Sequence, residues 1–538
     1  MGSQRLWKAA VTVFAVAVTA RLLPLLWTPY PFNPDGFMFA AWARDTIAAG
    51  ALADSIGPHG YVFPTLLSVG TIITGVAPLW LAQPVIAVIG ALPPVIAVVL
   101  VWRCTPMAGH TAATGAIAAT AAGLTLALEG VYLRRTVTVS YEVLGLLFVV
   151  ALAIAAQRVL QTRRPAWVLV TVLVLVVLPI THHLSTFMAA LTLTGLVVLA
   201  VARDGRAVLK PGLVLLGPFW GYLGGYYALT RPPYTAEVAA KPGLFVAWLV
   251  VLGAGALWLA RTSARSARLA IGTVIGSGFA ILGANAYWDL FPVTATTPAQ
   301  LLIYVAPLLV LAGLASWGVP VGTGRTGTRA IVLALLMAPI AWVGFALTAG
   351  VDPVYMDFVR RGQTFVHLAA AVCAGVAMVA LARRWPAPSR AKSLVTVGVP
   401  LVLCLCALVS LPVAFAGLEA LAYQGTTTTE EFETATFAAT TLDGEWTSDD
   451  HISRVSGNYY QTAASPQPTY SWLQGGALRC PTIMQASWQT VGAQRYPDSP
   501  RSLDPTVYAA TKASNSVVYT TTGADPLTLV VPPNGSTC

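Results

Sequence analysis

Long apolar runs recur along most of the chain and constrain its fold more than any other feature. Between Leu6 and Leu418 they approach the ~20 residues that a helix needs to cross ~30 Å of hydrocarbon, and short charged loops separate them. Hydrophobic residues make up 56% of the 538 residues and charged residues only 10%, so a soluble domain would lack the polar surface to cover such a core. The pattern therefore predicts an all-α polytopic bundle in a membrane.

The basic residues indicate how this bundle is oriented. Lys and Arg accumulate in short cytoplasmic loops. Six segments between the apolar runs hold most of them: Arg103, Arg158 to Arg164, Arg203 to Lys210, Arg261 to Arg268, Arg325 with Arg329, and Arg383 to Lys392. With these segments and the basic N-terminus inside, the chain crosses the cell membrane thirteen times and its C-terminal part lies outside.

The thirteen crossings can be placed approximately. They lie near residues 8–27, 84–102, 108–128, 143–157, 166–181, 184–202, 212–229, 244–260, 269–286, 301–318, 330–349, 364–382 and 393–416. We interpret the apolar segment from Tyr61 to Trp80 as a re-entrant or membrane-embedded helix, because another full crossing would invert every later loop. The first apolar run continues past Ala20 to Leu26, which favours a retained helix over a cleaved signal peptide.

Residues 420–538 contain no apolar run of spanning length. They hold 10 acidic and 5 basic residues, so the positive excess of the chain belongs to the membrane part. Stretches such as Asn515 to Thr522 and Leu527 to Val531 are rich in Thr, Val and Tyr, which predicts strands. We therefore expect a membrane domain at 1–419, with its first outer loop at 28–60, and a small extracytoplasmic α/β or mostly-β domain at 420–538.

The tail also contains aromatic residues that either form its core or stack on sugars, and we favour the core. They are Trp446, Tyr459, Tyr460, Trp472 and Trp488.

Few ionisable residues fall within the expected spans, which favours chemistry at the outer surface. Only Arg21, His110 and His367 do so, whereas a transporter normally needs polar groups near the bilayer midplane. The most informative outer segment runs from Asn33 to Gly50, where Pro34 and Gly36 flank Asp35 with turn chemistry. Asp35 either caps the helix that follows or presents a carboxylate at the edge of the membrane.

This organisation resembles the GT-C superfamily of glycosyltransferases. The resemblance rests on the retained first helix, Asp35 before an aromatic-rich helix with Arg44 and then Gly50, about thirteen spans, and an outward C-terminal domain. It implies a GT-C-like bundle that transfers a sugar from a polyprenyl-(pyro)phosphate donor to a glycan, lipid or protein acceptor at the outer face. It also implies that Asp35 is the catalytic carboxylate. Membrane lipids are expected partners, and nucleic acid is not.

Such a reaction needs a base and a site for the leaving phosphate. Asp35 would take the proton of the acceptor in an inverting transfer. The expected phosphate ligands are Arg360 with Arg361 and Arg134 with Arg135, because the planar guanidinium suits phosphate. The alternatives are interfacial anchoring, or salt bridges from Glu129 and Glu142 to the second pair. Other residues that could line the site are Arg44, Asp45, His59, Glu142, His182, His183 and Asp357.

The cofactor requirement stays open. Adjacent histidines on a helix point about 100° apart, so His182 and His183 cannot easily share one metal ion. Oligosaccharyltransferases of the superfamily use a divalent metal and a Trp-Trp-Asp-Tyr-Gly sequence, and the tail has no such sequence. A divalent metal therefore remains possible without an assigned site, and transfer of a small sugar unit is favoured.

The tail contains one pair of cysteines. Cys480 and Cys538 are the only cysteines in the outward tail, so we expect a disulfide between them.

The alternatives to a glycosyltransferase are a transporter or flippase of lipid-linked glycans, and a non-catalytic membrane protein that binds glycan.

Overall fold

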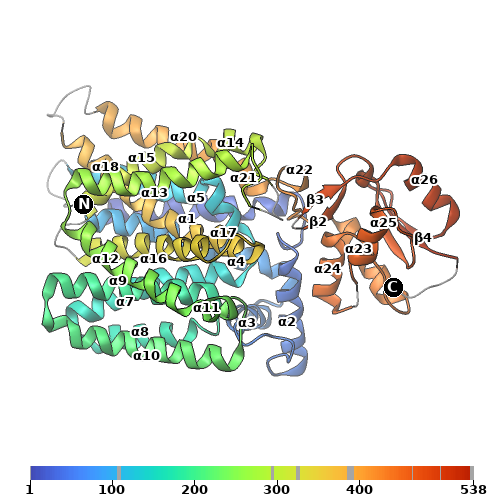
Figure 1. Cartoon of the computed structure of the whole chain (residues 1–538), viewed down its shortest axis with the longest axis horizontal. Coiled ribbons are helices and arrows are strands. Elements are labelled where there is room, and N and C mark those ends of the chain that lie inside the picture. Colours follow the sequence, from blue (N-terminus) through green and yellow to red (C-terminus); the bar gives the residue numbers. More distant parts are fainter. Residues whose placement is uncertain are drawn as a thin grey trace.

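A helical bundle with a smaller C-terminal group of elements at one end makes up the molecule (Figure 1). The computed structural model describes residues 2–105, 111–291, 296–322, 327–384, 393–462, 464–496, 498–533 and 538; His110, Arg325 and residues 385–392 of the predictions lie outside these ranges. Within them, nine helices are long and apolar enough to cross a membrane, or up to 11 if two bent pairs each count as one span. The predicted polytopic membrane bundle is therefore confirmed.

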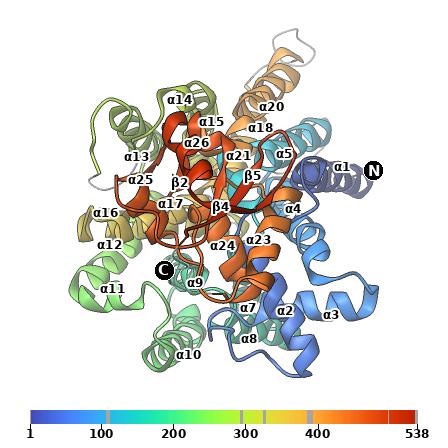
Figure 2. The ribbon, with the colours of Figure 1, turned by 90° about the vertical axis from the view of Figure 1, so that its right-hand side faces the viewer.

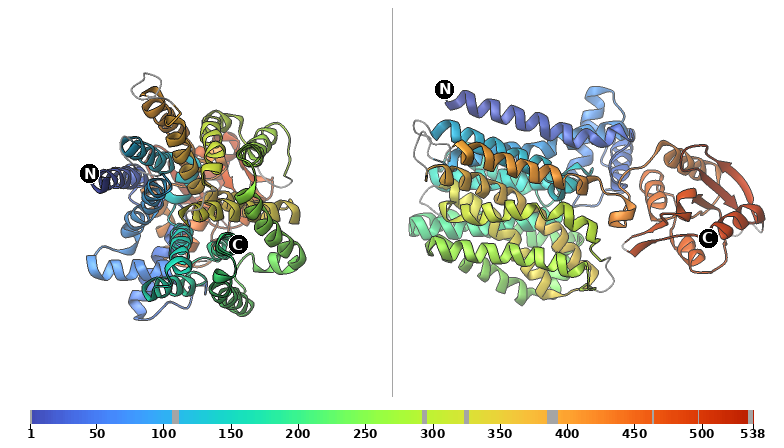
Figure 3. Two further views of the ribbon diagram at one scale, coloured as in Figure 1. Left: turned by 90° about the vertical axis from the view of Figure 1, so that its left-hand side faces the viewer. Right: turned by 90° about the horizontal axis from the view of Figure 1, so that it is seen from above.

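The long helices run side by side along the bundle (Figure 3). They are α1 (Gly2–Leu22) with η1 (Leu23–Leu26), α4 (Pro78–Cys104), α5 (Thr111–Leu128), α7 (Tyr141–Thr162), α8 (Pro165–Val177), α9 (His183–Asp204), α10 (Arg206–Thr230), α12 (Pro242–Arg261), α13 (Ala264–Asn285), α15 (Leu308–Gly322), α16 (Gly327–Ala349), α18 (Val366–Ala382), and η3 (Leu394–Gly398) with α20 (Val399–Ser410). Eleven of the thirteen expected crossings correspond to spans or bent pairs of this set. The other two coincide with α8, which has only 13 residues, and with α10.

Charged loops separate to the two ends of the bundle. At the end that holds the N-terminus, Arg268 and Arg384 both lie over the Trp317 ring, at 4.1 and 4.9 Å from its centroid. There too, Arg163 donates to the Ala207 carbonyl at 3.0 Å, which joins two of the predicted inner loops. The segregation agrees with the charge pattern, and the assignment of this end to the cytoplasm stays a prediction.

Short helices gather at the opposite end, which carries the C-terminal elements (Figure 2). They are α2 (Asp35–Ala49), α3 (Val62–Thr74), α6 (Gly130–Val137), α11 (Thr235–Ala240), α14 (Ala299–Val305), α17 (Pro353–Gly362) with η2 (Gln363–Phe365), α21 (Pro412–Phe415) and α22 (Leu418–Leu421). Helix α3 falls in the segment predicted to be membrane-embedded, and its Ile72 and Ile73 are 69% and 77% exposed. Such exposed apolar side chains suit contact with lipid.

The C-terminal elements form a small mixed group of helices and strands. They are α23 (Thr429–Thr441), α24 (Asp450–Tyr460), α25 (Gln467–Leu473), β1 (Thr482–Gln485), η4 (Ala486–Gln489), β2 (Ala493–Arg495), β3 (Asp498–Arg501), α26 (Pro505–Ser514), β4 (Ser516–Thr520) and β5 (Leu527–Val531). One antiparallel sheet has the order β1-β5-β4, with Thr482 opposite Val530 and Ser516 opposite Val531, and β2 pairs with β3. The two strands predicted from composition are confirmed.

The interior of this group is aromatic and closed by a covalent link. Trp446, Trp472 and Trp488 are buried, as favoured from the sequence. Cys480 and Cys538 form a disulfide with Cα atoms 5.0 Å apart. The domain boundary at 419/420 stays a prediction.

Candidate active site

Asp35 is the first residue of α2, but it does not cap that helix. The N-cap is Pro34, without a side-chain capping bond, so the capping alternative is wrong. The Asp35 carboxylate instead accepts a hydrogen bond from Arg454 Nη2 at 2.6 Å and one from Asn33 Nδ2 at 3.4 Å. The Asp35 side chain remains 38% exposed, so a reactant can approach it.

The backbone around Asp35 is closely confined. A Cβ atom on Gly36 would lie 2.4 Å from Pro31 Cβ and 3.1 Å from Val139 Cβ, so only glycine fits. Asn33 has a φ of 112°, a conformation that residues other than glycine rarely adopt. The loop before Asp35 is therefore held in one arrangement by its neighbours.

The tail supplies part of that confinement. Asn33 N donates to the Gly425 carbonyl at 2.7 Å, and Tyr423 donates its hydroxyl hydrogen to Asn33 Oδ1. Further back along the loop, Thr28 Oγ1 donates to the Thr427 carbonyl at 2.5 Å. Residues 423–428, which we call the tail strap, thus run along the loop that leads to Asp35.

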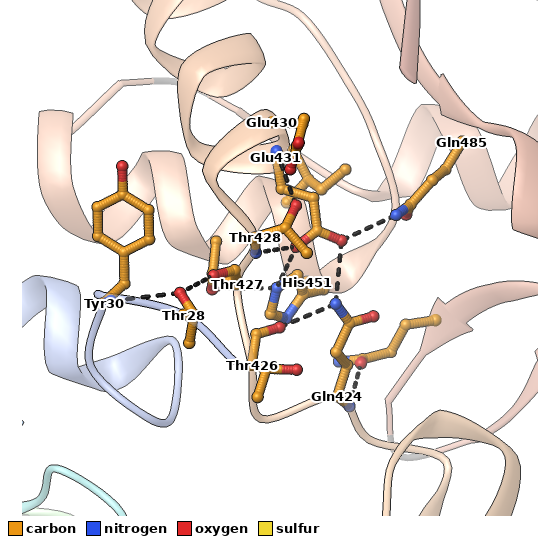
Figure 4. Close-up of polar contacts among 12 residues, drawn as sticks. Thr28, Tyr30, Gln424, Thr426, Thr427, Thr428, Glu430, Glu431, His451 and Gln485 are labelled. Carbon is orange, nitrogen blue, oxygen red and sulfur yellow. Dashed lines mark hydrogen bonds and ion pairs between the residues drawn. The ribbon is translucent and has the colours of Figure 1, made fainter. Parts of the chain in front are cut away.

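A buried polar network fixes the tail strap (Figure 4). The Glu431 carboxylate accepts from Thr428 N at 2.7 Å, Gln424 Nε2 at 3.0 Å and Gln485 Nε2 at 2.8 Å, and lies 3.7 Å from His451 Nε2. Burial alone would raise the pKa of Glu431, but the nearby imidazole and charge of His451, with the hydrogen bonds from Thr428 and Gln424, lower it to about 2. Burial alone would lower the pKa of His451, yet Glu431 raises it above its usual value.

Helix α24 lies against α2 through one face. Asn458 Nδ2 donates to the Pro34 carbonyl at 2.9 Å, next to the Arg454 contact with Asp35. Arg44 Nη2 donates to the Tyr459 carbonyl at 3.1 Å and also pairs with Asp45 at 2.8 Å. The structure therefore places Arg44 and Asp45 in the contact between α2 and α24.

Arg134 and Arg135 project from α6, where the chain bends by 61° after α5. Glu129 caps α6 by accepting from Val131 N at 2.9 Å and Tyr132 N at 3.1 Å. Gly130 permits a close approach, because a Cβ atom there would lie 1.8 Å from the Ser410 carbonyl oxygen.

The acids near these arginines pair elsewhere. Glu129 pairs with His367 Nδ1 at 2.7 Å and Glu142 with Arg361, so the predicted alternative of salt bridges to Arg134 and Arg135 is not what the structure shows. In the part of the chain that the structure describes, neither of these two arginines has an ion-pair partner. Arg134 donates to the Ala416 carbonyl at 3.1 Å.

Tyr423 shows that Asp35 and the arginines from different elements share one environment. Its pKa is raised above the usual range, first by burial and then by the charge of Asp35, whereas the charges of Arg454 and Arg134 lower it. The three charged groups therefore all act on one hydroxyl group. Tyr423 therefore lies near charged side chains from α2, α24 and α6.

A second polar cluster surrounds Arg361, which we call the histidine cluster. Arg361 lies 3.0 Å from Asp357 and 3.6 Å from Glu142, so two carboxylates balance its charge. Tyr234 donates its hydroxyl hydrogen to Asp357 and lies beneath the guanidinium. Near these groups are Tyr141 and three histidines, His59, His182 and His183, with centroids of adjacent imidazole rings 5.2 and 4.8 Å apart.

The histidine cluster contains unused hydrogen-bonding groups. His182 Nδ1 lies 2.8 Å from Ser185 Oγ, but His182 Nε2, both ring nitrogens of His183, and Glu142 Oε1 are buried without a partner. Such groups are costly unless something binds them. Across the ranges that the structure describes, no group of three or more His, Cys, Asp or Glu side chains could hold a metal ion.

The sequence predicted many of these residues but not their grouping. Asp35 and Arg134 act on the same hydroxyl, and His59, His182, His183, Glu142, Asp357 and Arg361 share the second cluster. Arg360, on the same helix as Arg361, forms no ion pair among the described residues. Sequence reasoning missed Arg454, Asn33 and Tyr423, and the only available signal was the helical spacing of Arg454 after Asp450.

Comparisons with known proteins give a distant likeness over the whole chain. No family model and no curated protein matches it. Among solved structures, the chain is similar to ArnT from Cupriavidus metallidurans bound to undecaprenyl phosphate, at 13% identity and a TM-score of 0.35, over 98% of this chain and 99% of that one. The apo state of the same ArnT matches at 12% identity and a TM-score of 0.35, over 98% of each chain.

Proposed function

We propose that this chain is a membrane glycosyltransferase of the GT-C type that uses a polyprenyl-(pyro)phosphate-linked sugar donor at the outer face of the membrane. The observation that carries the proposal is the carboxylate of Asp35, which accepts a hydrogen bond from Arg454 at one end of an apolar bundle, with Arg134 near Tyr423 at the same end. A base next to a cationic site is what sugar transfer from a lipid phosphate requires.

In the proposed reaction, Asp35 accepts the proton of an acceptor hydroxyl as its oxygen attacks the anomeric carbon. The bond between that carbon and the phosphate oxygen breaks, and its electron pair leaves with the lipid phosphate. Arg134 and Arg135 stabilise that charge, since no described carboxylate neutralises them. One displacement inverts the anomeric centre.

The histidine cluster suits a different part of the substrates. Because Glu142 and Asp357 balance Arg361, a phosphate would meet two carboxylates there. Its unpartnered imidazole and carboxylate groups offer both donors and acceptors to hydroxyl groups. We therefore assign it to the sugar or to the acceptor, and keep Arg360 as a further candidate for the phosphate.

The test is turnover of polyprenyl-phosphate sugars by the full chain in lipid nanodiscs. Asp35→Asn keeps the shape but removes the base, and should lower the turnover rate by about 10²- to 10⁴-fold. Asp54→Asn is the matched control, because Asp54 is exposed in the same outer loop. Full turnover by Asp35→Asn would refute the proposed role of Asp35.

A lipid-linked-glycan flippase is the second candidate. The buried Glu129 carboxylate lies 2.7 Å from Nδ1 of the half-buried His367 at the break between α5 and α6, and ionisable groups at broken spans often mark transport paths. Movement of a labelled lipid-linked glycan across vesicles that contain the chain, unaffected by Asp35→Asn, would favour this candidate.

A further inference from the structure

Arg454 belongs to the C-terminal elements but contacts Asp35, which lies in the first loop of the membrane part. It lies on α24 in the tail, 419 residues from Asp35 in sequence, and its Nη2 donates to the Asp35 carboxylate at 2.6 Å. Its Nη1 forms a second, longer ion pair with Asp450 at 3.8 Å. A guanidinium has five N–H donors, and among the described residues only Nη2 of Arg454 makes a hydrogen bond.

The position of Arg454 is maintained by contacts that do not involve its own side chain. Asn458, one turn further along α24, donates to the Pro34 carbonyl at 2.9 Å, and the tail strap holds the loop before Asp35. The Arg454 side chain is 33% exposed, so an anion from outside can reach it. Arg454 is therefore a rigidly presented cation at the edge of the proposed site.

The pairing with Asp35 also poses a chemical problem. Arg454 Nη2 donates to one oxygen of Asp35 and Asn33 Nδ2 to the other, so an acceptor hydroxyl would have to compete with both donors. The donor phosphate offers oxygens that match the guanidinium fork, and its negative charge rises above that of a carboxylate as it leaves as a phosphate monoester. Binding of a phosphate at Arg454 would therefore free Asp35.

We propose that Arg454 is a ligand of the lipid phosphate and that it exchanges Asp35 for that phosphate when the donor binds. This inference rests on the proposed function and adds a residue from the tail to the site. The exchange couples binding of the lipid phosphate to the release of Asp35, so Asp35 becomes free to accept a proton only when that phosphate is bound.

The experiment is a double-mutant cycle on the affinity of the full chain, in nanodiscs, for undecaprenyl phosphate. Arg454→Gln should weaken binding about tenfold, the loss expected for one charge-assisted hydrogen bond. Asp35→Asn should strengthen binding, because the phosphate no longer displaces a competing carboxylate. In the double variant this gain should shrink, since Arg454 is absent.

Three controls test whether the loss of affinity depends on the position of Arg454, on the phosphate and on the guanidinium group. Arg479→Gln, at an exposed arginine of the tail, should leave the affinity unchanged. Undecaprenol, which lacks the phosphate, should bind equally to the parent chain and to Arg454→Gln. Arg454→Lys keeps the charge but not the planar fork, so it should retain part of the affinity that Arg454→Gln loses. This second variant keeps the test valid if Arg454→Gln folds poorly.

Unchanged affinity in Arg454→Gln, or an equal gain from Asp35→Asn with and without Arg454, would overturn the inference. Failure of this inference and failure of the proposed function give different results. If Asp35→Asn abolishes turnover while the cycle shows no coupling, the transferase proposal stands and the role of Arg454 fails. If turnover survives but coupling is found, Arg454 binds lipid phosphate in a protein with another activity.

Discussion

Replacement of Glu431 by Gln tests whether the buried network holds the tail strap. Both oxygens of the Glu431 carboxylate are in use. One accepts hydrogen bonds from Gln424 and Gln485, and the other accepts from Thr428 N and faces His451. An amide has only one acceptor oxygen, so in either orientation its NH₂ group would point at donors. The variant therefore loses both the charge pairing and at least one buried hydrogen bond.

The magnitude follows from this geometry. Removing one partner of a buried ion pair costs about 3–5 kcal/mol, and each ~1.4 kcal/mol is a factor of ten. Amide hydrogen exchange in α23 and α24, measured on the full chain in nanodiscs, should therefore accelerate about 10²- to 10⁴-fold. Glu433→Gln, at an exposed position of α23, should exchange like the parent chain. Equal protection in the two variants would refute the network's role.

Three further predictions concern pH, the arginines and the disulfide. Because the pKa of His451 is raised in the folded tail, the stabilisation by His451 is complete below about pH 6.5 and is lost as the pH rises through the pKa of His451 in the folded state. Because the pKa of Glu431 is lowered, the stabilisation by Glu431 is lost only as the pH falls below about 4. Since burial also raises the pKa of Asp449 to about 6, exchange protection of α24 should be greatest near pH 4 to 5 and decline toward pH 8, and His451→Gln should flatten the decline above pH 6.5. Arg134→Gln should raise the KM for donor about tenfold and Arg361→Gln should lower kcat more than it raises KM; steady-state kinetics with the opposite split would exchange the two roles. Mass spectrometry without reductant should find Cys480 joined to Cys538, and Cys538→Ser should lower the free energy of unfolding of the tail by up to about 4 kcal/mol in denaturant titration; two free thiols would reject the pairing.

The helices of the bundle could be predicted because each is encoded by a short, continuous stretch of the sequence. Apolar runs and basic loops depend on neighbours in the sequence, so eleven of the thirteen expected crossings are found as spans or bent pairs. The strands Ser516–Thr520 and Leu527–Val531 were predictable for the same reason. The shortfall at Pro165–Val177 reflects a helix that ends at a turn before His182 rather than continuing.

The candidate site was only partly predictable, because its contacts are long-range. Asp35 stood out through its turn chemistry, but nothing near it in the sequence points to Arg454. Arg361 was expected to bind phosphate, whereas the fold places Glu142, from another helix, beside it and so balances its charge. Single residues can be nominated from sequence, but which charges cancel depends on how distant helices meet.

The strained backbone at Asn33 explains why the tail and the first outer loop belong to one site. A non-glycine residue at a φ of 112° costs on the order of 1–3 kcal/mol unless its surroundings hold it there. Two of the groups that do so, the Gly425 carbonyl and the Tyr423 hydroxyl, come from the tail strap. Because Asn33 also donates to the Asp35 carboxylate, loss of the strap would let the loop relax and move that carboxylate away from the arginines. The tail therefore has a structural role at the candidate site, separate from any group that it contributes to the proposed chemistry.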